Sequence, residues 1–100
     1  AHKLVIHLRD PACEVRAAAA LALGRMGMAN SAVGIARLLV DPLASVRRAA
    51  CEGLGSFAAS AQNLPEGLTG QLSVALEDDT TSVRAAALEA WDRLKSLPKA

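Results

Sequence analysis

The sequence is poor in aromatic residues and in cysteine, and both shortages restrict what it can encode. Its 100 residues include no Tyr, one Phe and one Trp, although 52% of them are hydrophobic. The interior must therefore consist mostly of Ala, Leu and Val, which fill space well only where backbones approach closely, as between packed helices. The two cysteines, Cys13 and Cys51, do not form a disulfide framework or a metal site. This sparse usage favours a reducing compartment, and we expect an intracellular, cytoplasmic protein.

The sequence also lacks an excess of charge and a long hydrophobic run. Lys and Arg number 11 and Asp and Glu number 10, which gives a formal net charge of +1. Domains that bind nucleic acid are usually strongly basic on one face. No run of eighteen apolar residues is present, so no transmembrane span is predicted. We therefore expect neither a nucleic-acid partner nor a membrane partner.

What the sequence does contain is one motif in three copies. The copies begin at Asp10, Asp41 and Asp78, so the steps between them are 31 and 37 residues. They read as DPACEVRAAAALALG (10–24), DPLASVRRAACEGLG (41–55) and DDTTSVRAAALEAWD (78–92). A motif that recurs at such a period indicates one structural unit built several times.

Each copy has the hydrophobic period of a helix with one buried face. Counted from its Val, the apolar positions lie at offsets of 0, 4, 8 and 11, which fits a helix and not a strand. The four columns are Val15, Val46 and Val83; Ala19, Ala50 and Ala87; Leu23, Leu54 and Trp91; and Met26, Phe57 and Leu94. The Asp at the head of each copy is predicted to cap this helix, with Pro11 and Pro42 at the first helical position.

A second apolar segment precedes each of these helices. Residues 31–40 and 66–77 have helical character, and residues 3–8 resemble the end of an equivalent helix. We therefore predict an all-α chain forming a single domain over 1–100. It comprises a partial repeat at 1–27 and full repeats at 31–58 and 65–97. The start, AHKLVIHLRD, lacks an initiator Met, and we expect the chain to be a piece of a longer array.

The motif L-x-D-P-x-x-x-V-R-x-x-A-A-x-x-x-L-G resembles the HEAT-like repeat, including the short form found in phycobilin lyases. It matches residues 8–24 and 39–55, whereas the third copy replaces its terminal Leu-Gly by Trp91-Asp92. The steps are shorter than the roughly 40 to 47 residues of most HEAT repeats, so only the compact form fits. The resemblance implies an α-solenoid, a right-handed superhelical stack of helix pairs. Its concave surface would bind another protein.

The motif's Arg and Gly have structural roles in this interpretation. The resemblance implies an Arg–Asp ladder, in which Arg16, Arg47 and Arg84 each reach the turn of a neighbouring repeat. A guanidinium can satisfy several acceptors there at once. Gly24 and Gly55 lie inside predicted helices, and we expect helices to cross there so closely that a Cβ would collide.

The candidate partner-binding residues lie on the second helix of each repeat, away from the buried columns. The resemblance places them on the inner, concave surface. They are Glu14, Ala17, Leu21, Ser45, Arg48, Glu52, Ser82, Ala85 and Glu89. Leu21 is apolar where its counterparts are Glu, which favours either contact with a partner or cover by a preceding repeat.

No motif in the sequence indicates catalysis or a cofactor. His2 and His7 have no further ligands near them, and the His-Glu pairs of di-iron HEAT-like hydroxylases are absent. Cys51 has no His downstream to act as a base. We expect no enzyme and no metal, but a scaffold or adaptor segment that binds a protein. Two alternatives stay open: a structural brace covered at both ends by flanking repeats of the same chain, and a chromophore-lyase-type subunit.

Overall fold

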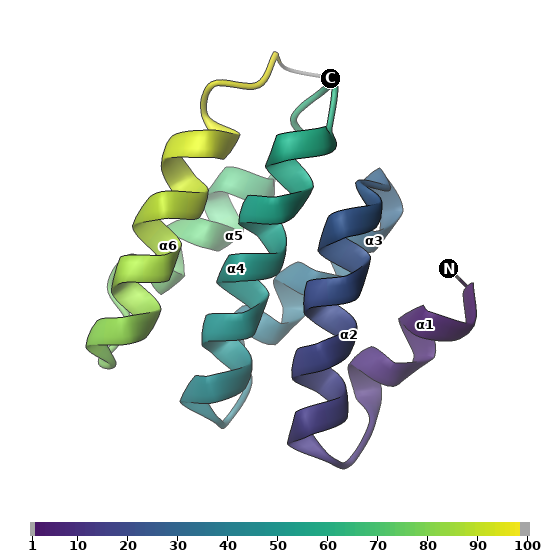
Figure 1. Cartoon of the computed structure of the whole chain (residues 1–100). Coiled ribbons are helices and arrows are strands. Elements are labelled where there is room, and N and C mark those ends of the chain that lie inside the picture. Colours follow the sequence, from purple (N-terminus) through teal and green to yellow (C-terminus); the bar gives the residue numbers. More distant parts are fainter. Residues whose placement is uncertain (1, 99–100) are drawn as a thin grey trace.

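The computed structural model describes residues 2–98, and within them the chain folds into six α-helices and two short 3₁₀ helices (Figure 1). In chain order these are α1 (His2–Ile6), η1 (His7–Arg9), α2 (Cys13–Met26), α3 (Ala29–Arg37), η2 (Leu38–Val40), α4 (Ala44–Ser60), α5 (Leu68–Ala75) and α6 (Thr81–Leu94).

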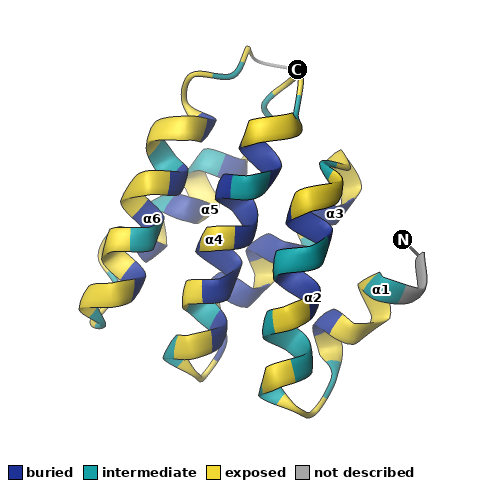
Figure 2. Cartoon of the chain, viewed as in Figure 1, coloured by how far each residue is buried: buried dark blue, intermediate teal, exposed yellow. Residues whose placement is uncertain are grey.

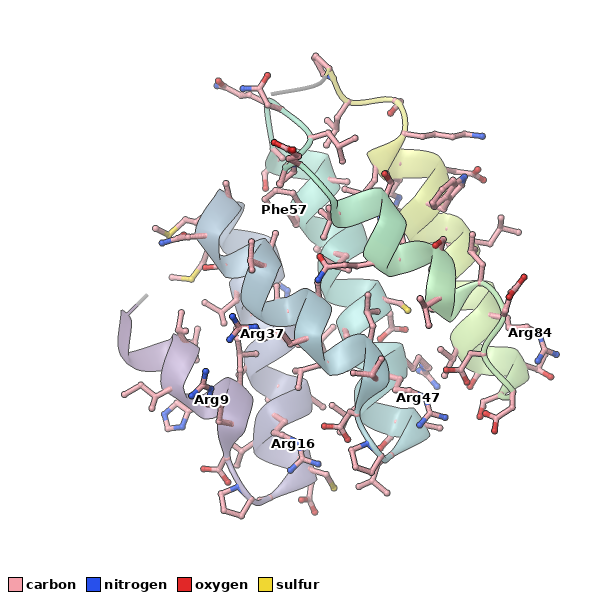
Figure 3. The ribbon with its side chains drawn as sticks, turned by 180° about the vertical axis from the view of Figure 1, so that it is seen from behind. Arg9, Arg16, Arg37, Arg47, Phe57 and Arg84 are labelled. Atoms are coloured by element: carbon pink, nitrogen blue, oxygen red, sulfur yellow. The ribbon has the colours of Figure 1, made fainter. Side chains whose placement is uncertain are left out.

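The helices form two layers. α2, α4 and α6 lie side by side at the front of Figure 1, and α1, α3 and α5 lie behind them. The same two layers are seen from the back in Figure 3. Each rear helix leads into the front helix that follows it, and the resulting slab measures 35 × 32 × 17 Å. This arrangement confirms the prediction of an all-α helical repeat.

The core lies between the layers and along the seams between the front helices (Figure 2). Most members of the four apolar columns are fully buried there. These are Ala19, Leu23, Val46, Ala50, Leu54, Phe57, Val83, Ala87 and Leu94. Burial at the same offsets in successive helices shows that the repeated sequence builds equivalent surroundings.

Three column positions depart from this pattern. Val15 and Trp91 are half-buried, and Trp91 packs against the edge of the core. Met26 is 49% exposed, although its equivalents Phe57 and Leu94 are buried. Val15 and Met26 lie on α2, whose rear neighbour α1 spans five residues against nine in α3. The shorter helix covers less of α2.

The prediction that the motif Asp residues cap the front helices is wrong. The helices begin later than expected, with Ala12, Leu43 and Thr80 as N-caps in extended conformation and without a side-chain capping bond. Each motif Asp instead accepts a hydrogen bond from the backbone N–H two residues on: Ala12 to Asp10, Leu43 to Asp41 and Thr80 to Asp78, at 2.8–3.0 Å. At Asp41 and Asp78 the Asx turn uses Oδ1, and the ladder arginine binds Oδ2 and shares Oδ1.

The chain reverses between α2 and α3 at Gly27. Its φ of 70° is in the left-handed region, as predicted for the residue that follows a helix. A longer connection, residues 61–67, separates α4 from α5 and accounts for most of the difference between the two repeat steps. It is fixed to the end of the described chain by a hydrogen bond from the Leu64 N–H to the Pro98 carbonyl, at 2.7 Å.

Candidate functional site

The first seam, between α2 and α4, is joined by Arg16. Its Nε and Nη2 donate to the two carboxylate oxygens of Asp41 at 2.9 and 3.2 Å. Its Nη1 donates to the carbonyl oxygens of Asp10 and Pro11 in the turn of its own repeat. One guanidinium therefore connects two successive turns, as the ladder predicts. The hydrogen bond to Asp41 also raises the pKa of Arg16.

Arg47 repeats this geometry at the second seam, between α4 and α6 (Figure 3). Its Nε and Nη2 donate to Asp78 at 2.8 and 3.3 Å, and its Nη1 donates to the carbonyl oxygen of Asp41 at 2.8 Å. Nη2 also contacts Asp79 and Thr80. The ladder is therefore a structural feature, which positions the front helices in a fixed register.

The carboxyl group of Asp78 makes the second seam sensitive to acid. Partial burial acts to raise its pKa, but hydrogen bonds from the Thr80 N–H and from Arg47 hold the pKa below its ordinary value of 3.8. A group whose pKa is lowered by folding stabilises the fold above its unfolded-state pKa. That contribution is lost as the pH falls through the lower, folded-state value.

We therefore expect the free energy of unfolding to decrease as the pH falls below about 4. Asp78→Asn should be less stable than wild type near neutral pH and should lose less stability on acidification, because the titrating group is gone. Urea unfolding at a series of pH values measures this. Glu66→Gln, at an exposed carboxylate in the connection 61–67, is the control and should keep the wild-type slope. Parallel curves for wild type and Asp78→Asn would contradict the assignment.

The first seam is also the closest approach of two helices. A Cβ added at Gly24 would collide with the carbonyl group of Gly53, and a Cβ at Gly53 would lie 2.5 Å from the carbonyl oxygen of Ala20. The prediction for Gly24 is therefore confirmed. The prediction for Gly55 is wrong: a Cβ there would make ordinary contacts, the nearest being Arg93 Nη1 at 3.4 Å and Ala90 Cα at 3.8 Å. The second seam is wider because Ala90 stands where the first has Gly53.

The nine candidate residues lie along α2, α4 and α6. We call their surface the front face; in Figure 2 these helices show exposed and half-buried residues toward the viewer. Ala17 and Leu21 are half-buried, and the other seven are exposed. Arg48 and Glu52 form an ion pair at 3.3 Å, both with side chains about half exposed. Glu14 accepts a hydrogen bond from Cys13, and its pKa is lowered, first by a backbone hydrogen bond and then by this one.

The structure brings two of these residues together in a hollow between α4 and α6. Glu52 and Glu89 line a space of about 190 Å³, together with Ser56 and Arg93. The small residues of the second seam form the rest of its lining. They are Cys51, Gly55, Ala86 and Ala90. Sequence reasoning missed Ser56 and Arg93, although both lie one helical turn beyond the Glu positions.

A larger hollow of about 440 Å³ lies in the rear layer, between α1 with η1 and α3. Its lining is mostly apolar, with Val5, Ile6 and Leu38 among the residues, and Arg9 and Arg37 are its two cations. Figure 3 shows both arginines on that side of the molecule. This hollow is on the opposite layer from the front face, and the sequence analysis did not identify it.

The cysteines have the surroundings of packing residues. Cys51 is fully buried, and burial, followed by the nearby Asp78 and Glu52, raises the pKa of its thiol to about 12. A thiol with such a pKa stays protonated at neutral pH and is a poor nucleophile. Within residues 2–98, His, Cys, Asp and Glu side chains form no group of three or more that could hold a metal ion.

Paired helices in register, close glycine crossings and an Arg–Asp ladder define the class of helical-repeat proteins, in which each unit packs only on its neighbours. None of the helices described for residues 2–98 has the length and apolar composition needed to cross a membrane.

The family follows from a comparison of the sequence with family models. The model of HEAT repeats matches residues 1–92, and the chain belongs to the HEAT-repeat family. No curated protein matches the chain. HEAT repeats generally serve as scaffolds for protein interaction and are typically not enzymes.

Proposed function

We propose that this chain is a scaffold segment that binds another protein on the front face of α2, α4 and α6. The observation that carries the proposal is the hollow between α4 and α6, where two candidate residues on different helices converge. Half of the residues that line the hollow have small side chains, so a side chain of a partner can enter between the helices. The proposal assigns no catalytic step to the chain.

The charges of the hollow specify the partner's chemistry. Glu52 and Glu89 supply two carboxylates to its lining against one cation, Arg93, and a Lys or Arg of the partner would be attracted to the two carboxylates. The Arg48–Glu52 pair is exposed, and such pairs contribute about 0 to 1 kcal/mol, so a partner's cation can replace Arg48 at little cost. We therefore propose that the bound segment carries a basic side chain.

Affinity capture with the isolated chain tests this proposal. Glu52→Lys with Glu89→Lys should abolish capture of proteins that the wild type retains, because the carboxylates become repulsive cations. The matched control is Glu66→Lys with Glu77→Lys, which makes the same charge change at exposed positions off the front face. Circular dichroism melting verifies that both variants fold.

A protein retained by wild type and control, and lost with the front-face variant, is then expressed and its Kd measured at increasing salt. The affinity should fall as salt rises, because the carboxylates are exposed and screened. If both double variants capture the same proteins as the wild type, the front face is not the binding surface.

The ends of the slab favour a second, structural proposal, in which flanking repeats of the same chain brace this segment. Leu88 on α6 is 55% exposed, although its equivalents in the inner seams are fully buried. Val5 and Ile6 on α1 are also exposed. Insertion of the segment between two neighbouring HEAT pairs should raise its melting temperature, whereas an unchanged value would count against a bracing role.

A further inference from the structure

The outer edge of α6 carries residue positions that are buried between neighbouring helix pairs elsewhere in the molecule, but no further pair of residues 2–98 covers them here. Two positions of the repeat, one just before the motif Asp and one on the front helix, are buried in both inner seams and accessible in the last repeat. The first comprises Leu8, Leu39 and Leu76, and the second Ala20, Cys51 and Leu88. Leu76 and Leu88 line an open hollow of about 480 Å³ together with Thr81, Arg84 and Ala85.

Arg84 is held at this edge in the same way as its equivalents in the inner seams. Its Nη1 donates to the carbonyl oxygen of Asp78 at 2.6 Å, just as Arg16 and Arg47 donate to the equivalent carbonyls at 2.8 Å. Its Nη2 donates to Thr81 Oγ1 at 3.1 Å. Within residues 2–98 its Nε has no acceptor, whereas Nε binds the next Asp in both inner seams. Figure 3 shows Arg84 at the outer edge of the molecule.

The opposite end of the slab carries the complementary half of such a pair. Asp10 forms the same Asx turn as Asp41 and Asp78, with the Ala12 N–H at 2.8 Å. Its side chain is 32% exposed, against 6% and 10% for the two paired carboxylates. The imidazole Nδ1 of His7 lies 4.0 Å from Oδ2 of Asp10.

We propose that two copies of this chain associate head to tail, with Arg84 of one copy binding Asp10 of the next. The turn and the first part of α2 of the second copy cover the hollow beside Leu88. Charge complementarity selects this occupant, because the partner must present a carboxylate on an Asx turn and this chain presents one. The contact joins two different surfaces, the edge of α6 and the Asp10 turn, so it is heterologous and can extend into open chains.

One residue limits the strength of this contact. Asp92 occupies the column of Gly24 and Gly55, and at Gly24 the helices of the first seam are too close to admit a Cβ. The Asp92 side chain keeps α2 of the second copy further from the C-terminal half of α6. Association is therefore close only at the turn end, and we expect it to be weak, concentration-dependent and reduced by salt.

Sedimentation equilibrium of the wild-type chain, from low micromolar to near-millimolar concentration, is the test. The average mass should rise with concentration beyond that of a dimer. Arg84→Ala and Asp10→Asn should each remain monomeric, and Asp10→Asn retains the acceptor of the Asx turn. An equimolar mixture of the two variants has one intact Arg84 and one intact Asp10. It should form a dimer of twice the monomer mass that does not grow further.

Arg48→Ala, which removes an exposed arginine on the central helix α4, is the control and should associate like the wild type. Circular dichroism shows whether each variant is folded. The proposal is overturned by a wild type that is monomeric at every concentration, or by association that both variants retain. Failure of the folded variants to dimerise when mixed overturns it as well. None of these outcomes bears on capture at the front face, so the two proposals can fail separately.

Discussion

Replacement of Arg47 by Ala is expected to lower the melting temperature by roughly 10 °C or more. The change removes a guanidinium that binds both oxygens of Asp78 and a carbonyl of its own turn. Hydrogen bonds to charged groups contribute about 1.5 to 3 kcal/mol, and loss of one partner leaves the half-buried acceptors unpaired. In a domain of this size, each kcal/mol lost from the free energy of unfolding lowers the melting temperature by about 4 to 8 °C. Thermal unfolding followed by circular dichroism measures the effect.

The neighbouring arginine provides a matched control. Arg48 lies on the same helix, but its pair with Glu52 is exposed to solvent. Arg48→Ala should therefore change stability by less than about 0.5 kcal/mol. If Arg47→Ala and Arg48→Ala melt at the same temperature, the ladder does not stabilise the seam. Binding at the front face by the folded fraction of Arg47→Ala should change little.

Gly24→Ala and Gly55→Ala should have opposite effects, although both introduce alanine into a helix at the same repeat position. At Gly24 the new methyl group meets the backbone of Gly53, and neither helix can move without opening the first seam. Such overpacking costs about 1 to 3 kcal/mol. We expect a net loss of up to about 2 kcal/mol after the helical preference of Ala over Gly, about 1 kcal/mol, is subtracted.

At Gly55 the new methyl group makes ordinary contacts, and its closest neighbour is the end of the flexible Arg93 side chain. The gain from helix propensity should then dominate, and Gly55→Ala should be neutral or more stable by up to about 1 kcal/mol. Urea unfolding of the two variants measures both values. Equal destabilisation at the two sites would contradict the difference in seam width that the structure shows.

The fold could be predicted from the sequence because its determinants are local and repeated. Val46 and Phe57 recur at helical spacing, and their equivalents in the third copy, Val83 and Leu94, are buried in the same way. The ladder could be expected as well, because the resemblance to HEAT-like repeats implies it and Arg and Asp occur in every copy. The limits of this reasoning appear where one copy differs from the others, as for the exposed Met26.

The remaining features depend on distances between helices, which a sequence does not state. Gly24 and Gly55 occupy one column, yet only the first is crowded, because the residue opposite is Gly53 in one seam and Ala90 in the other. The hollow beside Glu52 and Glu89 arises from the same extra width. The prediction that the Asp side chains cap the helices is wrong, because an Asp that forms an Asx turn two residues before the N-cap has the same sequence signature as a capping Asp.

The position of α4 also determines how the molecule opens. α4 packs against α2 on one side and α6 on the other, whereas each outer helix has a single front-layer neighbour. In a linear array of this kind, local unfolding begins at the ends and reaches the middle last. Backbone amides of α4 should therefore exchange with deuterium most slowly, and the two edges should fray as separate units.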